Sequence, residues 1–222
     1  MYHLAFPPRQ PAPAGRRPPR LLLLHGVGSH EEDLFSLAPY LDPRFHILSL
    51  RAPLTLSPGS YAWYEIAFNG DRFRFDPHQV ENARQVLMTF IQQAPQLYEI
   101  DPERVYLLGF SQGAIMSLTL ALTQPELLAG VVAIAGRTLP ELFRSDPPLG
   151  GHLAAPAAWQ DFPLLVMHGL YDPVLPIQHG RATRDHLARL PVALTYKEYD
   201  MGHYISEECL GDAARWLTER GN

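Results

Sequence analysis

Residues 104–118 read RVYLLGFSQGAIMSL, and the spacing of the apolar residues changes at one serine in the middle of this stretch. Val105–Phe110 is an almost unbroken apolar run, which predicts a strand buried on both faces of a parallel sheet. The apolar residues after Ser111 recur at helical spacing. Gly109 and Gly113 complete the pattern G-x-S-x-G, and they suit a turn so sharp that Cβ atoms at these positions would collide. The stretch therefore predicts a strand, a strained turn and a helix, with the serine hydroxyl lifted to the sheet edge.

The same alternation of short apolar runs and longer helical patterns continues along the chain. Asp76 is the predicted N-cap of the clearest helix, with Gln79 as its reciprocal capping partner. This order of elements is typical of an α/β fold with a mostly parallel central sheet and helices on both faces. Further strands are predicted at Leu21–His25, His46–Leu50, Gly130–Ala135, Leu164–His168 and Val192–Tyr199. Helices are predicted at Glu32–Leu41, Pro77–Ala94, Gln112–Thr123, Gln178–Leu190 and Ile205–Arg220.

Length and composition bound the class of protein. A chain of 222 residues predicts a single α/β domain over residues 1–222, in which residues 1–19 form an edge strand (Tyr2–Phe6) and a proline-rich connection. The net charge of −5 speaks against a nucleic-acid groove. No stretch of about 20 apolar residues is free of charges, so no stable membrane association is expected. Cys209 has no cysteine to pair with, and residues 1–20 lack the apolar core of a secretion signal, so the cytoplasm is the expected location.

A serine hydroxyl becomes a useful nucleophile only when a histidine takes its proton and an acid orients that histidine. When the serine occupies a turn of this kind, the acid follows the next-to-last strand and the histidine follows the last strand. Asp172 comes directly after PLLVMHGLY, and His203 comes after VALTYKEYDMG. The alternatives fit these places less well: His168 ends its strand, His179 and His186 fall in a helix, Asp161 precedes its strand, and Asp200 adjoins the wrong strand.

An oxyanion that forms at the serine needs two backbone donors. The N–H group of Gln112, directly after the serine, is the first candidate. The stretch LLLLHGVGS, residues 21–29, offers the second, because Val27 follows the end of an early strand. His25 in the same loop is expected to order the loop rather than to react.

Two segments are longer than ordinary connections and are candidates for a functional role. Ala52–Phe75 is rich in aromatic residues, which either line an apolar pocket or only anchor a long loop. Arg137–Gln160 either covers the site as a lid or is a plain connection, and its proline and glycine content favours the connection. The sequence has no cysteine pair, no H-E-x-x-H motif and no glycine-rich phosphate loop, so neither a metal nor a cofactor is expected.

These motifs together resemble the phospholipase/carboxylesterase branch of the α/β-hydrolase superfamily, which includes acyl-protein thioesterases and small bacterial esterases. The likeness runs in order from residue 24 to residue 206, which is nearly the whole chain. It rests on LHGVGSHEEDL, on RAP at Arg51–Pro53, on YAWY at Tyr61–Tyr64, and on DPERVYLLGFSQGA, HGLYDPVLP and GHYIS.

The resemblance implies a catalytic triad of Ser111, Asp172 and His203, with Val27 and Gln112 as oxyanion donors. Val27 departs from the leucine that is usual in this branch. The family also places a tryptophan at position 63, which makes Trp63 the first candidate for the pocket wall. Tyr64 and Phe68, from the same aromatic-rich segment, are the other two candidates.

The implied function is a cofactor-free serine hydrolase that cleaves small-molecule carboxylic esters through an acyl-enzyme. Acyl thioesters and lysophospholipids are alternative substrates for the same fold. A catalytically silent hydrolase fold that binds a small apolar ligand or a protein is the alternative from another class. Homodimers are common in this branch, so the resemblance implies a possible homodimer, although no stripe in this sequence proves one.

Overall fold

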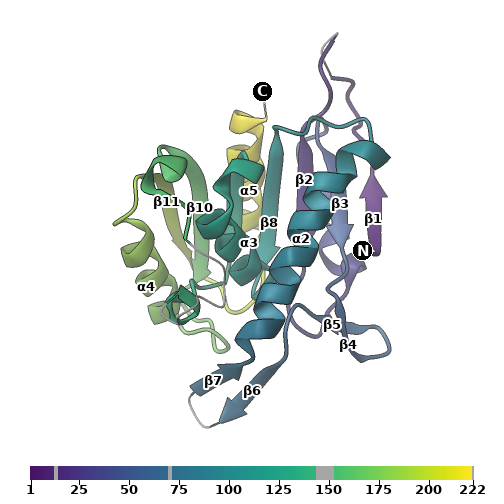
Figure 1. The fold of residues 1–222 in the computed structure, drawn as a ribbon. Helices are drawn as coiled ribbons and strands as arrows, with labels where there is room; N and C mark the ends of the chain where they lie inside the picture. Colours follow the sequence, from purple (N-terminus) through teal and green to yellow (C-terminus); the bar gives the residue numbers. More distant parts are fainter. Residues whose placement is uncertain (13–14, 70–71, 144–152, 222) are drawn as a thin grey trace.

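Seven strands form the central sheet in the computed structural model, which describes residues 1–12, 15–69, 72–143 and 153–221 (Figure 1). Every neighbouring pair is parallel except the edge pair β1 and β3, which is antiparallel. The predicted mostly parallel sheet is therefore confirmed. From edge to edge the strands are β1 (His3–Phe6), β3 (His46–Leu50), β2 (Arg20–Leu24), β8 (Val105–Phe110), β9 (Gly130–Ile134), β10 (Phe162–Gly169) and β11 (Val192–Tyr199).

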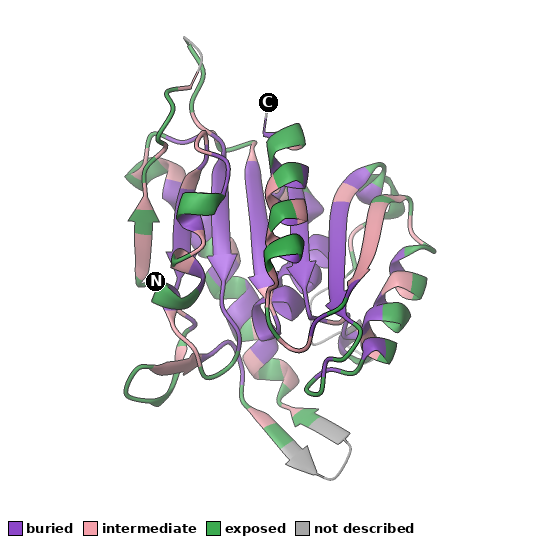
Figure 2. Cartoon of the chain, turned by 180° about the vertical axis from the view of Figure 1, so that it is seen from behind, coloured by how far each residue is buried: buried purple, intermediate pink, exposed green. Residues whose placement is uncertain are grey.

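Helices cover both faces of the sheet, because successive residues of the buried strands point to opposite sides. In β2, Leu22 and Leu24 pack in one apolar cluster with α2 (Pro77–Leu97), α3 (Gln112–Thr123) and α4 (Ile177–Leu187). Leu21 and Leu23 pack in a second cluster with α1 (Glu31–Phe35) and α5 (Glu207–Arg220). Figure 2 shows α5 lying across the buried strands on the second face. Within the described residues, no helix is both long enough and apolar enough to cross a membrane.

The strand order reverses between β2 and β8, and this reversal fixes where a ligand can bind. The chain first moves from β2 to β3 on one side, and later builds β8, β9, β10 and β11 on the other side. Connections after β2 and after β8 therefore leave the sheet in opposite directions. A crevice opens beyond the carboxyl ends of two such strands. The predicted serine follows β8, and the predicted Val27 donor follows β2.

Four of the five helices differ in extent from the sequence prediction: besides α1, α2 continues to Leu97, α4 covers Ile177–Leu187, and α5 begins at Glu207. The helix expected at Glu32–Leu41 is wrong in extent: α1 ends at Phe35 and a separate 3-10 turn covers Ala38–Tyr40, because a proline at position 39 cannot continue an α-helix. Asp76 caps α2 as predicted, since its carboxylate accepts from the N–H of His78 at 2.9 Å. Gln79 does not return the cap, because its Oε1 accepts from the N–H of Glu65 at 2.7 Å.

The long segment Ala52–Phe75 contains two hairpins that the sequence analysis did not anticipate. The first pairs β4 (Leu54–Ser57) with β5 (Ser60–Ala62), and the second pairs β6 (Ile66–Asn69) with β7 (Arg72–Phe75). Figure 1 shows both hairpins beyond the edge of the sheet at which α3 begins. They therefore lie where they can border the crevice.

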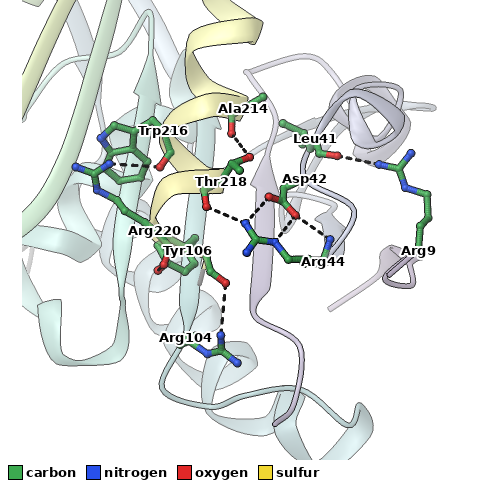
Figure 3. Close-up of polar contacts among 11 residues, drawn as sticks. Arg9, Leu41, Asp42, Arg44, Arg104, Tyr106, Ala214, Trp216, Thr218 and Arg220 are labelled. Carbon is green, nitrogen blue, oxygen red and sulfur yellow. Dashed lines mark hydrogen bonds and ion pairs between the residues drawn. The ribbon is translucent and has the colours of Figure 1, made fainter. Parts of the chain in front are cut away.

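Polar contacts fix α5 against the opposite end of the sheet (Figure 3). The Arg44 guanidinium pairs with the carboxylate of Asp42 at 2.7 Å and also donates to the carbonyl of Thr218 at 2.8 Å. The hydroxyl of Tyr106 in β8 donates to the carbonyl of Arg220 at 2.7 Å. These carbonyls belong to the last turn of α5, whose carbonyl groups have no partner within the helix. The contacts therefore anchor the helix that follows the predicted histidine loop.

Candidate active site

Ser111 occupies the strained turn that the sequence predicts. Its backbone has φ 53° and ψ −116°, which is a conformation that residues with a side chain rarely adopt. A Cβ atom at Gly113 would collide with the backbone carbonyl of Leu24 in β2, and one at Gly109 would collide with the backbone of Gly113. The N–H group of Ser111 donates to the carbonyl of Ile134 in β9 at 2.9 Å. The neighbouring strands therefore hold the turn in its unfavourable conformation.

Three side chains from the ends of three strands form one continuous chain of hydrogen bonds. Nε2 of His203 lies 2.9 Å from Oγ of Ser111, and Nδ1 of His203 lies 2.7 Å from Oδ2 of Asp172. The other carboxylate oxygen of Asp172 accepts from the N–H groups of Val174 and Leu175 at 2.8 and 2.7 Å. Since an ionised carboxylate can only accept, the histidine proton lies on Nδ1 and Nε2 is free to take the serine proton.

A second histidine, His168, which the sequence does not favour as the base, lies beside the acid. His168 in β10 is fully buried, and its Nε2 lies 2.7 Å from the carbonyl of Leu175 and 3.7 Å from Oδ2 of Asp172. His168 therefore holds the loop that carries the carboxylate.

The two predicted oxyanion donors, Val27 and Gln112, both line the cavity at Ser111. Gln112 begins α3, so its N–H belongs to the first turn, where backbone donors have no acceptor within the helix. Val27 lies in a turn held on both sides, because the N–H of Gly28 donates to the Tyr61 carbonyl at 2.8 Å and the N–H of Ser29 donates to the Gly26 carbonyl at 3.3 Å.

His25 orders this turn, as the sequence analysis expected. Its Nδ1 lies 2.7 Å from the carbonyl of Gly26, and its Nε2 accepts from the N–H of Ala52 at 3.1 Å. Burial lowers the pKa of His25, which favours the neutral ring that these two contacts require.

A mostly apolar cavity opens directly onto the serine. Its cavity volume is about 50 Å³. Tyr64 lines the cavity as predicted, and Arg137 is its one charged lining residue among the residues that the structure describes. The side chain of Phe68, the third predicted wall residue, lies outside the described residues, as does the centre of the predicted lid, residues 144–152. The full lining consists of Val27, Tyr64, Ile66, Phe75, Ser111, Gln112, Ile115, Arg137, Val174 and Leu175.

A family model described as Phospholipase/Carboxylesterase matches residues 11–220. The chain belongs to the phospholipase/carboxylesterase family. It is therefore a hydrolase of the α/β-hydrolase fold, of the esterase and thioesterase class.

Individual relatives agree with this family. Acyl-protein thioesterase 1 homolog 1 of Dictyostelium discoideum is 32% identical over 162 residues, which cover 71% of this chain and 67% of the relative. Acyl-protein thioesterase 1 of Kluyveromyces lactis is 29% identical over 215 residues and 90% of both chains. The crystal structure of a Bacillus cereus carboxylesterase has the same fold, with a TM-score of 0.80 at 23% identity over 99% of this chain and 94% of that one.

Trp63, at the position of the family tryptophan, does not line the cavity as expected. Its side chain is fully buried, and its indole N–H donates to the carbonyl of His25 at 2.9 Å. The Gln112 side chain completes this contact layer in a way that the sequence did not indicate. Its Oε1 accepts from the N–H of Trp63 at 2.8 Å, and its Nε2 donates to the carbonyl of Tyr64 at 2.7 Å. The residue after the serine therefore ties α3 to the segment that contacts the turn at Val27.

Replacing Gln112 by alanine is expected to lower both stability and kcat in this member of the phospholipase/carboxylesterase family. The variant leaves a buried N–H and a buried carbonyl without partners, at about 1–3 kcal/mol each, and it loosens the support of the oxyanion turn. Chemical denaturation and ester kinetics measure the two effects. Gln79→Ala is the matched control, because that glutamine bridges the same segment at the exposed residue Glu65. Equal losses of kcat in the two variants would contradict a positioning role for Gln112.

Proposed function

We propose that the protein hydrolyses carboxylic esters through a covalent acyl-enzyme on Ser111. His203 takes the proton of the serine hydroxyl as Oγ attacks the carbonyl carbon, and Asp172 stabilises the resulting imidazolium. The N–H groups of Val27 and Gln112 donate to the oxyanion of the tetrahedral intermediate. The imidazolium then gives its proton to the leaving alcohol. In the second half of the reaction His203 takes a proton from water as the water attacks the acyl-enzyme, and it then returns a proton to Oγ of Ser111.

One observation carries this proposal: the unbroken hydrogen-bond chain from Ser111 through His203 to the buried carboxylate of Asp172, at the mouth of an apolar cavity. Burying a carboxylate costs free energy unless the carboxylate is hydrogen-bonded or paired with a charge. Here it accepts from two backbone N–H groups and faces the imidazole. The arrangement supplies a nucleophile, a base and an orienting acid in hydrogen-bond contact, which the reaction requires.

Acyl thioesters are the second candidate substrates, because the curated relatives include acyl-protein thioesterases. The oxyanion is the same for an ester and a thioester, and only the leaving group differs. The cytoplasmic location, the absence of a cofactor and a homodimeric assembly stay predictions.

Hydrolysis of a substrate panel tests the proposal. The panel contains nitrophenyl esters from acetyl to palmitoyl, the matching acyl-CoA thioesters and a lysophospholipid, each measured with the wild type and with Ser111→Ala. Ester hydrolysis that disappears in the variant supports the proposal. Turnover confined to thioesters would move the function to the second candidate. A folded wild type without turnover of any substrate would favour the silent, ligand-binding alternative.

A further inference from the structure

A single arginine faces the otherwise apolar cavity beside the serine. Arg137 lies in the loop that follows β9, and its side chain is only 17% exposed. The loop is held close to α3, because a Cβ atom at Gly136 would collide with the side chain of Ala114. The other cavity-lining side chains that the structure describes are uncharged, and most of them are apolar. A guanidinium in such surroundings needs a counter-charge, because burying an unpaired charge is costly.

Glu141 supplies only part of that counter-charge. Its Oε1 accepts from Nη2 of Arg137 at 2.7 Å, but the Glu141 side chain is 44% exposed, so water screens part of the attraction. A guanidinium carries five N–H donors in a planar fork, and this contact uses one nitrogen. Tyr64 lines the same cavity. Burial raises the pKa of Tyr64, and the nearby positive charge of Arg137 opposes that rise. The cavity therefore combines apolar walls with a positively charged region.

The acyl group and the leaving group of an ester must extend to different sides of Ser111. Ser111 and both oxyanion residues line it, whereas His203 is not among the described residues that do. The leaving-group oxygen must face Nε2 of His203, because it receives its proton from that atom. The group on the other side of the carbonyl carbon consequently enters the cavity toward Arg137.

We propose that the acyl group of the preferred substrate ends in a carboxylate, which Arg137 binds, so that the enzyme hydrolyses half-esters of dicarboxylic acids. This inference rests on the proposed ester hydrolysis at Ser111. Water adds across the acyl–oxygen bond, and the products are the alcohol, a dicarboxylate and one proton. The methylene chain contacts the apolar walls, while the terminal carboxylate displaces part of the Glu141 contact and pairs with the guanidinium fork.

The test compares monoethyl esters of dicarboxylic acids, from succinate to suberate, with ethyl esters of monocarboxylic acids of the same chain length. Release of ethanol gives kcat and KM for both series with the wild type, Arg137→Met, Arg137→Lys and Glu141→Gln. The wild type is expected to prefer the half-esters and to show one optimal chain length. In Arg137→Met the preference should fall about tenfold to a hundredfold, mainly through KM, because a charge-assisted contact to the bound carboxylate is lost.

The other variants separate binding from structure. Arg137→Lys keeps the charge without the fork and should retain part of the preference. Glu141→Gln removes the competing carboxylate and should raise the half-ester preference severalfold. Arg181→Met is the matched control, because Arg181 pairs with Glu198 at 2.8 Å on the exposed surface of α4 and should leave the preference unchanged.

Several outcomes would overturn the inference. Equal turnover of the two ester series by the wild type would show that the cavity does not recognise a carboxylate. Equal losses on both series in Arg137→Met, with a lower midpoint of unfolding, would make Arg137 a structural partner of Glu141. Inhibition of ester hydrolysis by free dicarboxylates can also be compared with inhibition by carboxylates of the same chain length that end in a phosphonate. Stronger inhibition by the phosphonate would assign the site to a phosphorylated ligand. These results leave ester hydrolysis at Ser111 intact. A wild type that turned over none of the esters in either series would instead contradict the proposed function itself.

Discussion

Replacing Ser111 by alanine is expected to lower kcat for ester hydrolysis by about 10⁴-fold to 10⁶-fold. The variant removes the nucleophile and leaves only the oxyanion donors and the cavity, which together provide a small residual rate. The fold should survive, because the Cβ atom stays in place and the strained turn is held by neighbouring strands. Burst kinetics with a nitrophenyl ester measure the loss, since the burst reports formation of the acyl-enzyme.

Ser117→Ala is the matched control for that variant. Ser117 lies in α3, the helix that follows Ser111, and its hydroxyl donates to the Gly113 carbonyl at 2.8 Å without lining the cavity. Its loss should cost about 1 kcal/mol of stability and leave kcat near the wild-type value. If Ser111→Ala kept more than a hundredth of the wild-type kcat, the serine would not be the nucleophile.

Replacing Asp172 by asparagine is expected to lower kcat by about 10⁴-fold. The amide oxygen can still accept from Val174 and Leu175, so the loop should keep its shape. An amide cannot stabilise the imidazolium of His203, and its NH₂ group favours the tautomer that places the histidine proton on Nε2. In that tautomer the imidazole cannot accept the proton of Ser111.

The two carboxylates near the same strands serve as controls for the acid. Asp161 precedes β10 and Asp200 follows β11, and neither is hydrogen-bonded to His203 in the structure. Asp161→Asn and Asp200→Asn should each change kcat by less than twofold. A loss of kcat in Asp200→Asn as large as that in Asp172→Asn would contradict Asp172 as the carboxylate that orients His203.

The strands and the polar side chains at their ends were predictable because the signals are local. Val105–Phe110 has the observed bounds of β8, since a buried parallel strand is a continuous apolar run. Val192–Tyr199 also has the observed bounds of β11, although this edge strand is mostly half-buried and includes polar residues. Asp172 and His203 could be placed because chain order fixes which strand ends share one edge of the sheet. Their hydrogen bonds to each other and to Ser111 follow from that placement.

The support of the site could not be predicted, because it depends on contacts between distant segments. The Gln112 side chain contacts residues 48 and 49 positions away, and no sequence pattern marks such a pair. The same holds for Trp63, which is buried against the loop of His25 although its aromatic neighbourhood suggested a pocket wall. Arg137 lies in a connection without periodicity, so its position on the cavity wall appears only in the folded chain.

The most direct measurement is the mass and location of a covalent adduct formed with a fluorophosphonate, which mimics the tetrahedral intermediate. We expect one adduct per chain, located at Ser111 by peptide mapping, with formation slowed at least a thousandfold in His203→Gln. An adduct on another residue, or equally fast labelling of Ser111 in the wild type and in His203→Gln, would contradict nucleophilic catalysis by a histidine-activated Ser111.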